Sequence, residues 1–333
     1  MELRHLRYFV AVAETGGLTT AAKQRLHTAQ PSLSRQIREL ETEVGVQLLI
    51  RSARGIELTA AGLAFLDHAR NALAQAEAAT EAARRSADPA KPIFALGFLT
   101  GQEMVWLPEA MNVLRDELPK IQVTVLSQYS PLLAEALTRG KLDLAFMRAE
   151  LGMPGLTYQV VAEEHLVVVF PSDHRLASLE EIDPREFAGE SFITASSTAP
   201  TVKAFIDKFM SRSGLDIHPA HEVDNLTMAF SMVASMRGVM LLPAYAENFL
   251  PASVISRPLA GDQPLIDLVI GYSKNNRSQT LRLFLSRIDD LISRSRKVGR
   301  DPKVRIGERK IGENDKIIAG NLRRIDPGAL ARG

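Results

Sequence analysis

Cysteine is absent from the 333-residue chain, and this absence excludes several classes of protein. Without thiols there is no disulfide framework, no thiolate zinc site and no cysteine nucleophile. The N-terminus, MELRHLRYFVAVAETGG, spreads charges among its apolar residues and lacks the features of a secretory signal. No stretch is long and apolar enough to span a bilayer. Together these absences predict a cytoplasmic protein with no membrane partner.

The sequence motifs of common enzymes are missing as well. The 7 histidines show no metal-ligand spacing, and His218 with His221 alone is a weak pair. There is no nucleophile elbow, no phosphate-cradling loop and no dinucleotide fingerprint. The sequence therefore predicts no catalytic residues, no metal and no other cofactor.

The net charge of +1 hides an uneven distribution of charge along the chain. Residues 294–333 contain 12 Lys and Arg against 5 Asp and Glu, and they are poor in aromatics. This tail is predicted to be largely disordered, with either no specific role or a nonspecific contact to nucleic acid. Residues 1–58 contain 8 basic and 6 acidic residues, so the arrangement of those residues matters more than their sum.

Residues 18–37 have the pattern of a helix-turn-helix. Leu33, Ile37 and Leu40 recur at helical spacing and are expected to face inward. Pro31 suits the first turn of the second helix, where a backbone donor has no partner anyway. The outward face then carries small polar and basic groups, and such a helix can enter a DNA major groove end-on. The residues predicted to contact DNA are Gln30, Pro31, Ser32, Ser34, Arg35, Arg38, Arg51 and Arg54.

Among these residues Arg35 is the predicted base reader. A guanidinium can bond both acceptors on the major-groove edge of guanine, which gives ~1–3 kcal/mol of discrimination. Arg38 is expected to contact phosphate, which positions the protein without reading sequence. The alternative for each arginine is a solvated charge or an ion pair with Glu39, Glu41 or Glu43.

Residues 1–58 are expected to form a compact DNA-binding domain. Its helices are predicted near residues 2–14, 19–26 and 31–44. Two short strands around a turn, a wing, are predicted at residues 48–58. The wing arginines are expected at phosphate or in the minor groove.

Residues 59–88 predict one long helix, because alanine has the highest helix propensity. Small and apolar residues alternate by four and three along it, which is the spacing of a coiled-coil seam. A solitary helix of this length needs a partner for such a stripe, so we favour dimerisation over packing on its own domain. The predicted seam positions are Leu66, Ala69, Leu73, Ala76 and Thr80. Two prolines then predict a stiff hinge at residues 89–92.

From residue 93 to 293 predicted strands alternate with helices, which indicates an α/β domain with mostly parallel sheets. The length suffices for two lobes with a cleft between them. Lobe I is expected at about residues 93–161 and 266–293, and lobe II at about 162–265. The predicted strands are 93–99, 122–127, 142–147, 165–170, 191–194, 239–242 and 265–272.

Polar residues repeatedly follow these strands where a helix begins. A helix N-terminus offers free amide donors to an anion, and ligands of open α/β folds gather at the carboxyl ends of strands. Helix capping is the alternative at each position, but recurrence in both lobes favours a ligand site. The predicted ligand-binding residues are Thr100, Gly101, Gln128, Ser130, Arg148, Thr198, Pro200, Thr201, Val202 and Asn225.

Arg148 is the one charged residue among these candidates. It is expected to pair with a ligand carboxylate across the cleft, or else with Glu150 or Glu103. Because charged groups are few, the predicted ligand is a small organic acid, aromatic acids included, bound mainly through hydroxyls and amides.

Two segments, LRYFVAVAETGGLTTAA and TAQPSLSRQIRELETEVGVQLLIRSARGIELTAAG, make the chain resemble the LysR-type transcriptional regulators. The resemblance covers residues 1–293, by sequence over the first 66 and by layout beyond them. Leu49 stands where the family has phenylalanine in the first wing strand, and this apolar replacement is expected to leave the wing intact. The basic tail lies outside the resemblance.

The resemblance implies an α+β multi-domain protein with an N-terminal winged helix-turn-helix, a dimerising linker helix and a C-terminal two-lobed effector domain like a periplasmic binding protein. It implies promoter DNA, a small-molecule effector, a second copy of the chain and RNA polymerase as partners, with dimers pairing into tetramers. The alternatives are a solute-binding protein and a ligand-binding enzyme with an appended DNA-binding domain. The helix-turn-helix counts against the first, and the lack of an acid–base constellation counts against the second.

Overall fold

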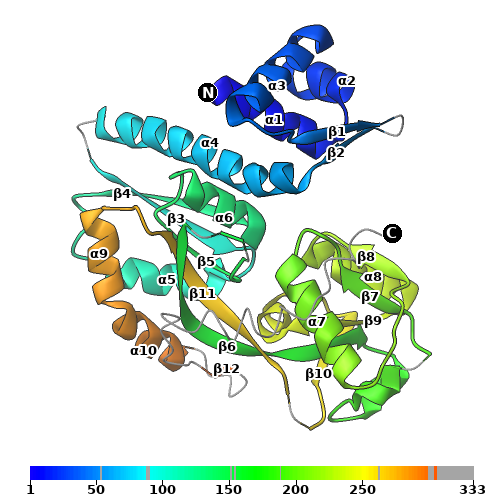
Figure 1. Cartoon of the computed structure of the whole chain (residues 1–333). Helices are drawn as coiled ribbons and strands as arrows, with labels where there is room; N and C mark the ends of the chain where they lie inside the picture. The colour runs from blue at the N-terminus through cyan, green and yellow to red at the C-terminus, as the bar shows by residue number, and fades with distance from the viewer. Residues whose placement is uncertain are drawn as a thin grey trace. The chain divides into compact units, whose positions relative to one another are not determined.

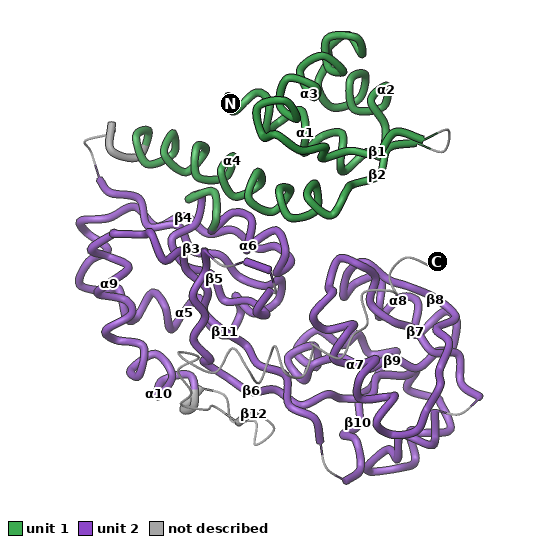
Figure 2. Tube along the Cα trace, in the orientation of Figure 1, with its two compact units in different colours: residues 1–87, 138–140 green, residues 88–137, 141–333 purple. Residues whose placement is uncertain are grey.

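The computed structural model describes residues 1–52, 55–87, 91–150, 152–153, 155–187, 189–261, 263–298 and 304–305. They belong to two compact units, residues 1–87 with 138–140, and residues 88–137 with 141–333 (Figure 2). Each unit has a hydrophobic core of its own. No helix within the described ranges is both long enough and apolar enough to cross a membrane.

The N-terminal unit is a winged helix-turn-helix followed by a long helix (Figure 1). The elements of the winged part are α1 (Leu3–Thr15), α2 (Leu18–Thr20) continuing into the π-helical turn η1 (Ala21–Leu26), α3 (Gln30–Val44), β1 (Leu49–Ser52) and β2 (Gly55–Leu58). α3 ends at Gly45, whose φ of 83° is the left-handed conformation that favours glycine at a helix end. Leu33, Ile37 and Leu40 are fully buried in the core of this unit, as their spacing predicted.

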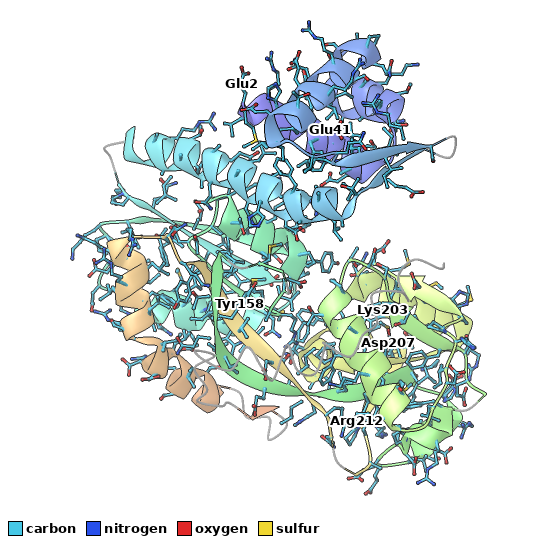
Figure 3. The ribbon with its side chains drawn as sticks, in the orientation of Figure 1. Glu2, Glu41, Tyr158, Lys203, Asp207 and Arg212 are labelled. Carbon is cyan, nitrogen blue, oxygen red and sulfur yellow. The ribbon has the colours of Figure 1, made fainter. Side chains whose placement is uncertain are left out.

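A carboxylate of α3 holds the start of the wing. Glu41 Oε1 accepts the backbone N–H groups of Leu48 (2.9 Å) and Leu49 (3.0 Å), where β1 begins (Figure 3). Leu49 itself is buried, so the apolar replacement expected at this position fills the core. The orientation of the wing is therefore set by the same helix that presents the predicted DNA contacts.

The long helix α4 (Ala60–Ala87) starts against the wing. The Thr59 hydroxyl oxygen accepts the N–H of Gly62 (2.8 Å), and a Cβ at position 62 would lie 1.9 Å from the carbonyl oxygen of Leu48. Only glycine allows this approach of helix to strand.

The first half of α4 packs on its own domain, which was the alternative to dimerisation, and the dimer seam stays a prediction. Leu66 and Ala69 are only 7% and 2% exposed, and both lie in the core formed with α1. Phe65 lies edge-on to Phe9 of α1, with ring centroids 5.2 Å apart. At Leu66 and Ala69 the stripe of small and apolar residues along α4 is thus buried by other residues of the same chain.

The second unit contains a sheet that is shared by two lobes. Lobe I holds β3 (Ile93–Leu99), β4 (Gln122–Gln128), β5 (Leu144–Met147) and β11 (Leu265–Ser273). Two apolar clusters pack against these strands. The helices of this lobe are α5 (Glu103–Val113), α6 (Ser130–Thr138), α9 (Gln279–Ser286) and α10 (Ile288–Val298).

Lobe II holds β7 (Phe192–Ala195), β8 (His221–Val223), β9 (Val239–Pro243) and β10 (Val254–Pro258). Its longer helices are α7 (Pro200–Arg212) and α8 (Leu226–Met236), and two further apolar clusters form its core. Three short 3-10 helices complete it, η2 (Arg175–Ser178), η3 (Pro184–Phe187) and η4 (Ala244–Phe249).

One strand, β6 (Leu156–Pro171), runs through both lobes (Figure 1). Residues 156–165 pair with β11 of lobe I, and the following residues pair with β9 and β10 of lobe II, all antiparallel. The prediction of mostly parallel sheets is therefore wrong. Among the named strands of the described residues, the parallel pairs are those of β4–β3–β5 in lobe I and β9–β7–β8 in lobe II.

The predicted basic tail lies mostly outside the described residues. Within it, α10 continues to Val298, five residues beyond the predicted end of the folded region, and Val304–Arg305 form the short strand β12. β12 pairs with Glu163 and Glu164 of β6. The predicted hinge at 89–92 is described only at its last two residues.

Candidate DNA-binding face and ligand pocket

The N-terminal turns of α3 carry an exposed polar surface. Gln30, Pro31 and Ser32 are all exposed, and so are Arg35 and Arg38 further along the helix. The opposite side of α3 is buried in the core, so these five residues lie on the side of the helix that is exposed to solvent. They are five of the residues predicted to contact DNA.

Ser34 is not part of that exposed face, which corrects its predicted orientation. Its side chain is 7% exposed, and Arg51 of the wing donates a hydrogen bond from Nη1 to Ser34 Oγ (3.1 Å). Ser34 therefore joins helix and wing and positions an arginine. Arg54, the other wing arginine predicted to contact DNA, lies outside the described residues.

Arg35 is both exposed and paired. Its Nε lies 3.5 Å from Oε1 of Glu39, one turn along α3, with the two side chains 71% and 47% exposed. The ion pair that was the alternative for this residue is thus present. Exposed pairs of this kind contribute roughly 0–1 kcal/mol, so a stronger acceptor can displace Glu39.

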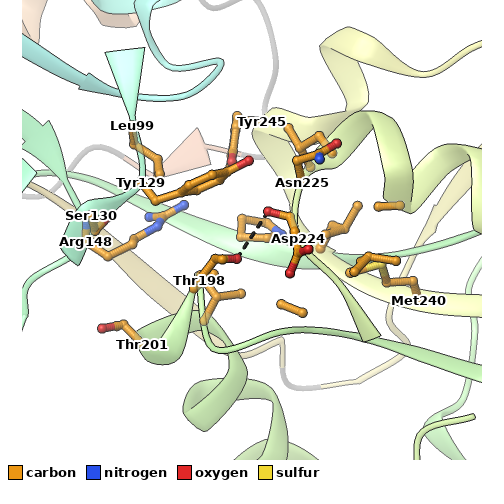
Figure 4. A pocket seen from close by; sticks show the side chains of 18 of the residues that line it. Leu99, Tyr129, Ser130, Arg148, Thr198, Thr201, Asp224, Asn225, Met240 and Tyr245 are labelled. Carbon is orange, nitrogen blue, oxygen red and sulfur yellow. Dashed lines mark hydrogen bonds between the residues drawn. The ribbon is translucent and has the colours of Figure 1, made fainter. Parts of the chain in front are cut away.

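A pocket that is open to solvent is lined by both lobes of the second unit. Leu99, Tyr129, Arg148 and Glu150 line it from lobe I, while residues of β7, α7, β8, α8 and β9 line it from lobe II. Figure 4 shows Arg148 with Ser130 on one side and Asp224 with Asn225 on the other.

Arg148 is the most buried charge in the pocket, with 1% exposure. Its Nη2 pairs with Glu164 of β6, which also accepts a hydrogen bond from Gln102 Nε2 (2.9 Å). Its Nη1 donates to the carbonyl oxygen of Ile266 in β11 (3.5 Å). The partner of Arg148 is thus Glu164, in place of the predicted Glu150 or Glu103, and it lies on the strand shared by the two lobes.

One donor of Arg148 stays unsatisfied: Nε is buried without a hydrogen-bond acceptor. A buried donor without a partner costs about 1–3 kcal/mol, so such groups are uncommon in folded proteins unless a water, an ion or a ligand supplies the acceptor. Since Arg148 lines the pocket, a ligand oxygen is an acceptor that can reach this side chain.

A hydrogen-bonded contact joins the two lobes at the edge of the pocket. The Thr201 hydroxyl at the start of α7 lies 3.1 Å from the carbonyl oxygen of Ala149 and 3.3 Å from Oε1 of Glu150. Burial raises the pKa of Glu150 from 4.5 to about 7, against the opposing effect of the Thr201 hydrogen bond. Near neutral pH this carboxyl is therefore partly protonated.

The opposite side of the pocket holds a positioned carboxylate. Asp224 Oδ1 accepts a hydrogen bond from Ser196 Oγ (2.6 Å), and the Thr198 hydroxyl donates to the carbonyl oxygen of Asp224 (3.1 Å; Figure 4). Asn225 lines the pocket and also caps α8, because its Oδ1 accepts the N–H of Met228 (2.8 Å). Asn225 is therefore a helix cap, as the alternative predicted, and it is also a lining residue of the pocket.

Two tyrosines complete the polar lining. Burial raises the pKa of Tyr129, and the nearby charge of Asp224 raises it further. Burial also raises the pKa of Tyr245, whose ring centroid lies 5.9 Å from the guanidinium carbon of Arg148. Both rings therefore remain neutral hydrogen-bonding groups near neutral pH.

Six of the predicted ligand-binding residues line the pocket: Ser130, Arg148, Thr198, Thr201, Val202 and Asn225. The other four, Thr100, Gly101, Gln128 and Pro200, are not among its lining residues. The helix start after β3 shows why. Glu103 Oε2 accepts the N–H of Gly101 (2.7 Å), so the chain's own carboxylate occupies the amide expected to bind an anion.

Sequence reasoning missed Tyr129, Glu150, Asp224 and Tyr245, which also line the pocket. Tyr129 and Asp224 each directly precede a predicted residue. The segments selected after the predicted strands should therefore have included one more residue at each of these two places. Glu150 was considered only as an ion-pair partner, and no pattern in the sequence pointed to Tyr245. No group of three or more His, Asp or Glu residues suited to a metal ion occurs in the described part of the chain.

Comparison with known proteins assigns both regions of the chain. Residues 3–63 match the model of the bacterial regulatory helix-turn-helix protein, lysR family, and residues 88–292 match the LysR substrate binding domain. The Hca operon transcriptional activator HcaR of Escherichia coli (strain K12) is 37% identical over 298 residues, which cover 88% of this chain and 99% of HcaR. The regulator AlsR of Bacillus subtilis (strain 168) is 32% identical over 286 residues, covering 86% and 94%.

Two solved full-length structures are similar to this chain over most of its length. Full-length BenM aligns with a TM-score of 0.54 and 27% identity over 88% of this chain and 97% of BenM. CbnR in complex with its target DNA aligns with a TM-score of 0.52 and 25% identity over 88% and 100%. These relatives are transcription regulators rather than enzymes, and their fold is the predicted one. The chain therefore belongs to the LysR family and is a DNA-binding transcriptional regulator controlled by a small molecule.

Proposed function

We propose that this regulator reads promoter DNA with the N-terminal turns of α3. Arg35 contacts base edges, Gln30, Pro31 and Ser32 lie along the groove, and Arg38 and Arg51 contact the sugar–phosphate backbone. The exposure of Arg35 and its weak pairing with Glu39 support this assignment. Ser34 acts indirectly, because it holds Arg51. Arg54, at the predicted tip of the wing, is proposed as a further backbone contact.

We further propose that the effector is a small organic acid bound between the two lobes. The observation that carries this proposal is the buried Nε of Arg148, which has no acceptor and belongs to a side chain that lines a pocket between the two lobes. A ligand carboxylate oxygen would satisfy it, while Thr198, Thr201 and Asn225 contribute polar contacts from lobe II. Because both lobes line the pocket, a bound acid would also hold the lobes at a defined separation.

The proposed organisation is a DNA-binding domain at residues 1–58, a linker helix at 59–88, a hinge at 89–92, an effector domain at 93–293 and a basic tail beyond it. The chain associates into dimers and these into tetramers in the cytoplasm. The effector alters the assembly, and with it DNA bending and contact with RNA polymerase.

The test is footprinting of the full chain on the promoter region beside its own gene, with and without a panel of aliphatic and aromatic acids. The expected result is a protected site whose pattern changes with an acid that also raises the melting temperature of the protein, because a bound effector stabilises the fold by mass action. A panel in which only sugars or cations stabilise the protein would refute the acid as effector.

A further inference from the structure

The pocket has two ends of opposite chemistry, and this restricts the ligand that it can hold. At the lobe I end the guanidinium of Arg148 has one buried N–H without an acceptor. At the lobe II end Asp224 presents a carboxylate that is fixed in place by Ser196 Oγ. The lobe I end therefore offers a hydrogen-bond donor to the ligand, and the lobe II end offers a hydrogen-bond acceptor.

Charge decides which end takes a ligand carboxylate. Arg148 attracts it, whereas Asp224 repels a second carboxylate brought close to it. Glu150, which also lines the pocket, adds to this repulsion in its ionised form. A dicarboxylate therefore suits the pocket poorly, and a monocarboxylate fits only with its charged group toward Arg148.

Much of the remaining lining of the pocket is apolar. The pocket lining includes Leu99 from lobe I and Val202, Leu226, Met240 and Leu242 from lobe II. An apolar ligand body is stabilised there by burial, but a body that ends in a plain C–H at Asp224 would desolvate this carboxylate without replacing its hydrogen bonds with water. A hydroxyl at that end of the ligand replaces them.

We propose that the effector is a hydroxylated aromatic monocarboxylate, bound with its carboxylate at Arg148 and its hydroxyl donating to Asp224. A phenol has an acidic O–H, and a ring holds hydroxyl and carboxylate at a fixed separation, which matches two preorganised partners. This proposal rests on the proposed effector role of the pocket and adds Asp224 as the residue that sets specificity.

The test measures affinities by titration calorimetry on the full chain, with matched pairs of acids. The pairs are benzoate with para-hydroxybenzoate, and phenylpropanoate with para-hydroxyphenylpropanoate. At least one hydroxylated member is expected to bind about tenfold tighter than its parent. The para-methoxy analogue, which keeps the oxygen but lacks the donor, should lose this preference, and terephthalate should not bind.

The variant Asp224→Asn removes the charged acceptor, and it is expected to erase the preference for the hydroxyl while still binding the parent acid. Asp216→Asn is the matched control, because Asp216 is 94% exposed and is not among the residues that line the pocket. Equal affinity of both members of each pair for the wild-type chain would overturn the proposal, as would tighter binding of an ammonium analogue such as para-aminomethylbenzoate.

The outcomes also separate this inference from the proposed function. If acids bind and change the promoter footprint without any preference for a hydroxyl, the assignment of Asp224 fails and the acid effector stands. If no acid binds and the footprint responds to none, the effector proposal itself fails.

Discussion

Arg35 shows how a single side chain can be paired in the free protein and still serve DNA. Replacing Arg35 by alanine removes an exposed ion pair of little energetic weight. The melting temperature should therefore stay within about 1 °C of wild type, while a gel shift with the operator should show loss of binding by about tenfold or more.

Arg4→Ala is the matched control, because Arg4 also pairs with an exposed glutamate, Glu2, and its loss removes the same charge from the same unit. Operator affinity should fall far less in that variant. An Arg35→Ala protein with full operator affinity would refute the assignment of Arg35 as base reader.

Gly62 matters for a steric reason. A Cβ there would lie 1.9 Å from the Leu48 carbonyl oxygen, so Gly62→Ala must push α4 away from the wing. We expect a destabilisation of about 1–3 kcal/mol or more in denaturant unfolding. Gly155→Ala is the control, since a Cβ at that position meets nothing within 4 Å. Equal stability of the two variants would contradict the close approach of helix and wing.

At the scale of elements, the two halves of α4 have different roles to test. Leu66 is buried in the core of its own domain, so Leu66→Ala should lower the free energy of unfolding by about 2–5 kcal/mol. Ala76 and Thr80 are the predicted seam positions furthest from that core. If the dimer seam runs along this part of α4, Ala76→Glu should increase the fraction of monomer in sedimentation velocity with little loss of stability.

Gln75→Glu provides the control for the seam, because it introduces the same charge on a different face of α4. That variant should sediment as wild type does. Indistinguishable sedimentation of Ala76→Glu and Gln75→Glu would move the dimer contact away from this face of the helix.

At the scale of the whole molecule, Glu150 links the two lobes and makes their contact depend on pH. Burial raises the pKa of Glu150 from 4.5 to about 7, so the folded state favours the neutral carboxyl. The stability it contributes is present below pH ~4.5 and is lost as pH rises through about 7. Allowing for solvent screening of a partly exposed group, the loss is about 1–2 kcal/mol.

Glu150→Gln keeps a polar side chain that does not titrate. Wild type should therefore lose a few degrees of melting temperature relative to this variant between pH ~5 and ~8, measured by calorimetry. A constant difference between the two proteins over that range would show that Glu150 is solvated in solution.

The same carboxyl should make effector binding depend on pH. An anionic ligand in the pocket favours the protonated form of Glu150, so the affinity of wild type for an acid should fall as pH rises through about 7. In Glu150→Gln the affinity should change much less over the same range. A titration series at several pH values checks this, and parallel curves for the two proteins would contradict it.

Local sequence determined the DNA-binding unit almost completely. The burial of Leu33, Ile37 and Leu40 follows from spacing within one helix, and α3 begins one residue from its predicted start. Such patterns depend on neighbours three or four residues away, which a sequence displays directly. The strand Ile93–Leu99 was likewise predicted at its exact bounds, because it is a continuous apolar run.

The tertiary structure decided which residues from distant segments of the chain are in contact. Two of the residues that a seam pattern assigned to a partner, Leu66 and Ala69, lie in the core formed with α1. Ser34 is buried and accepts a hydrogen bond from Arg51 of the wing. Arg148 is paired with Glu164, a residue on the strand that joins the lobes. The sequence supplies the residue types and their periodicity. Which charges meet across a pocket depends on contacts between residues far apart in the chain, and no local pattern encodes these.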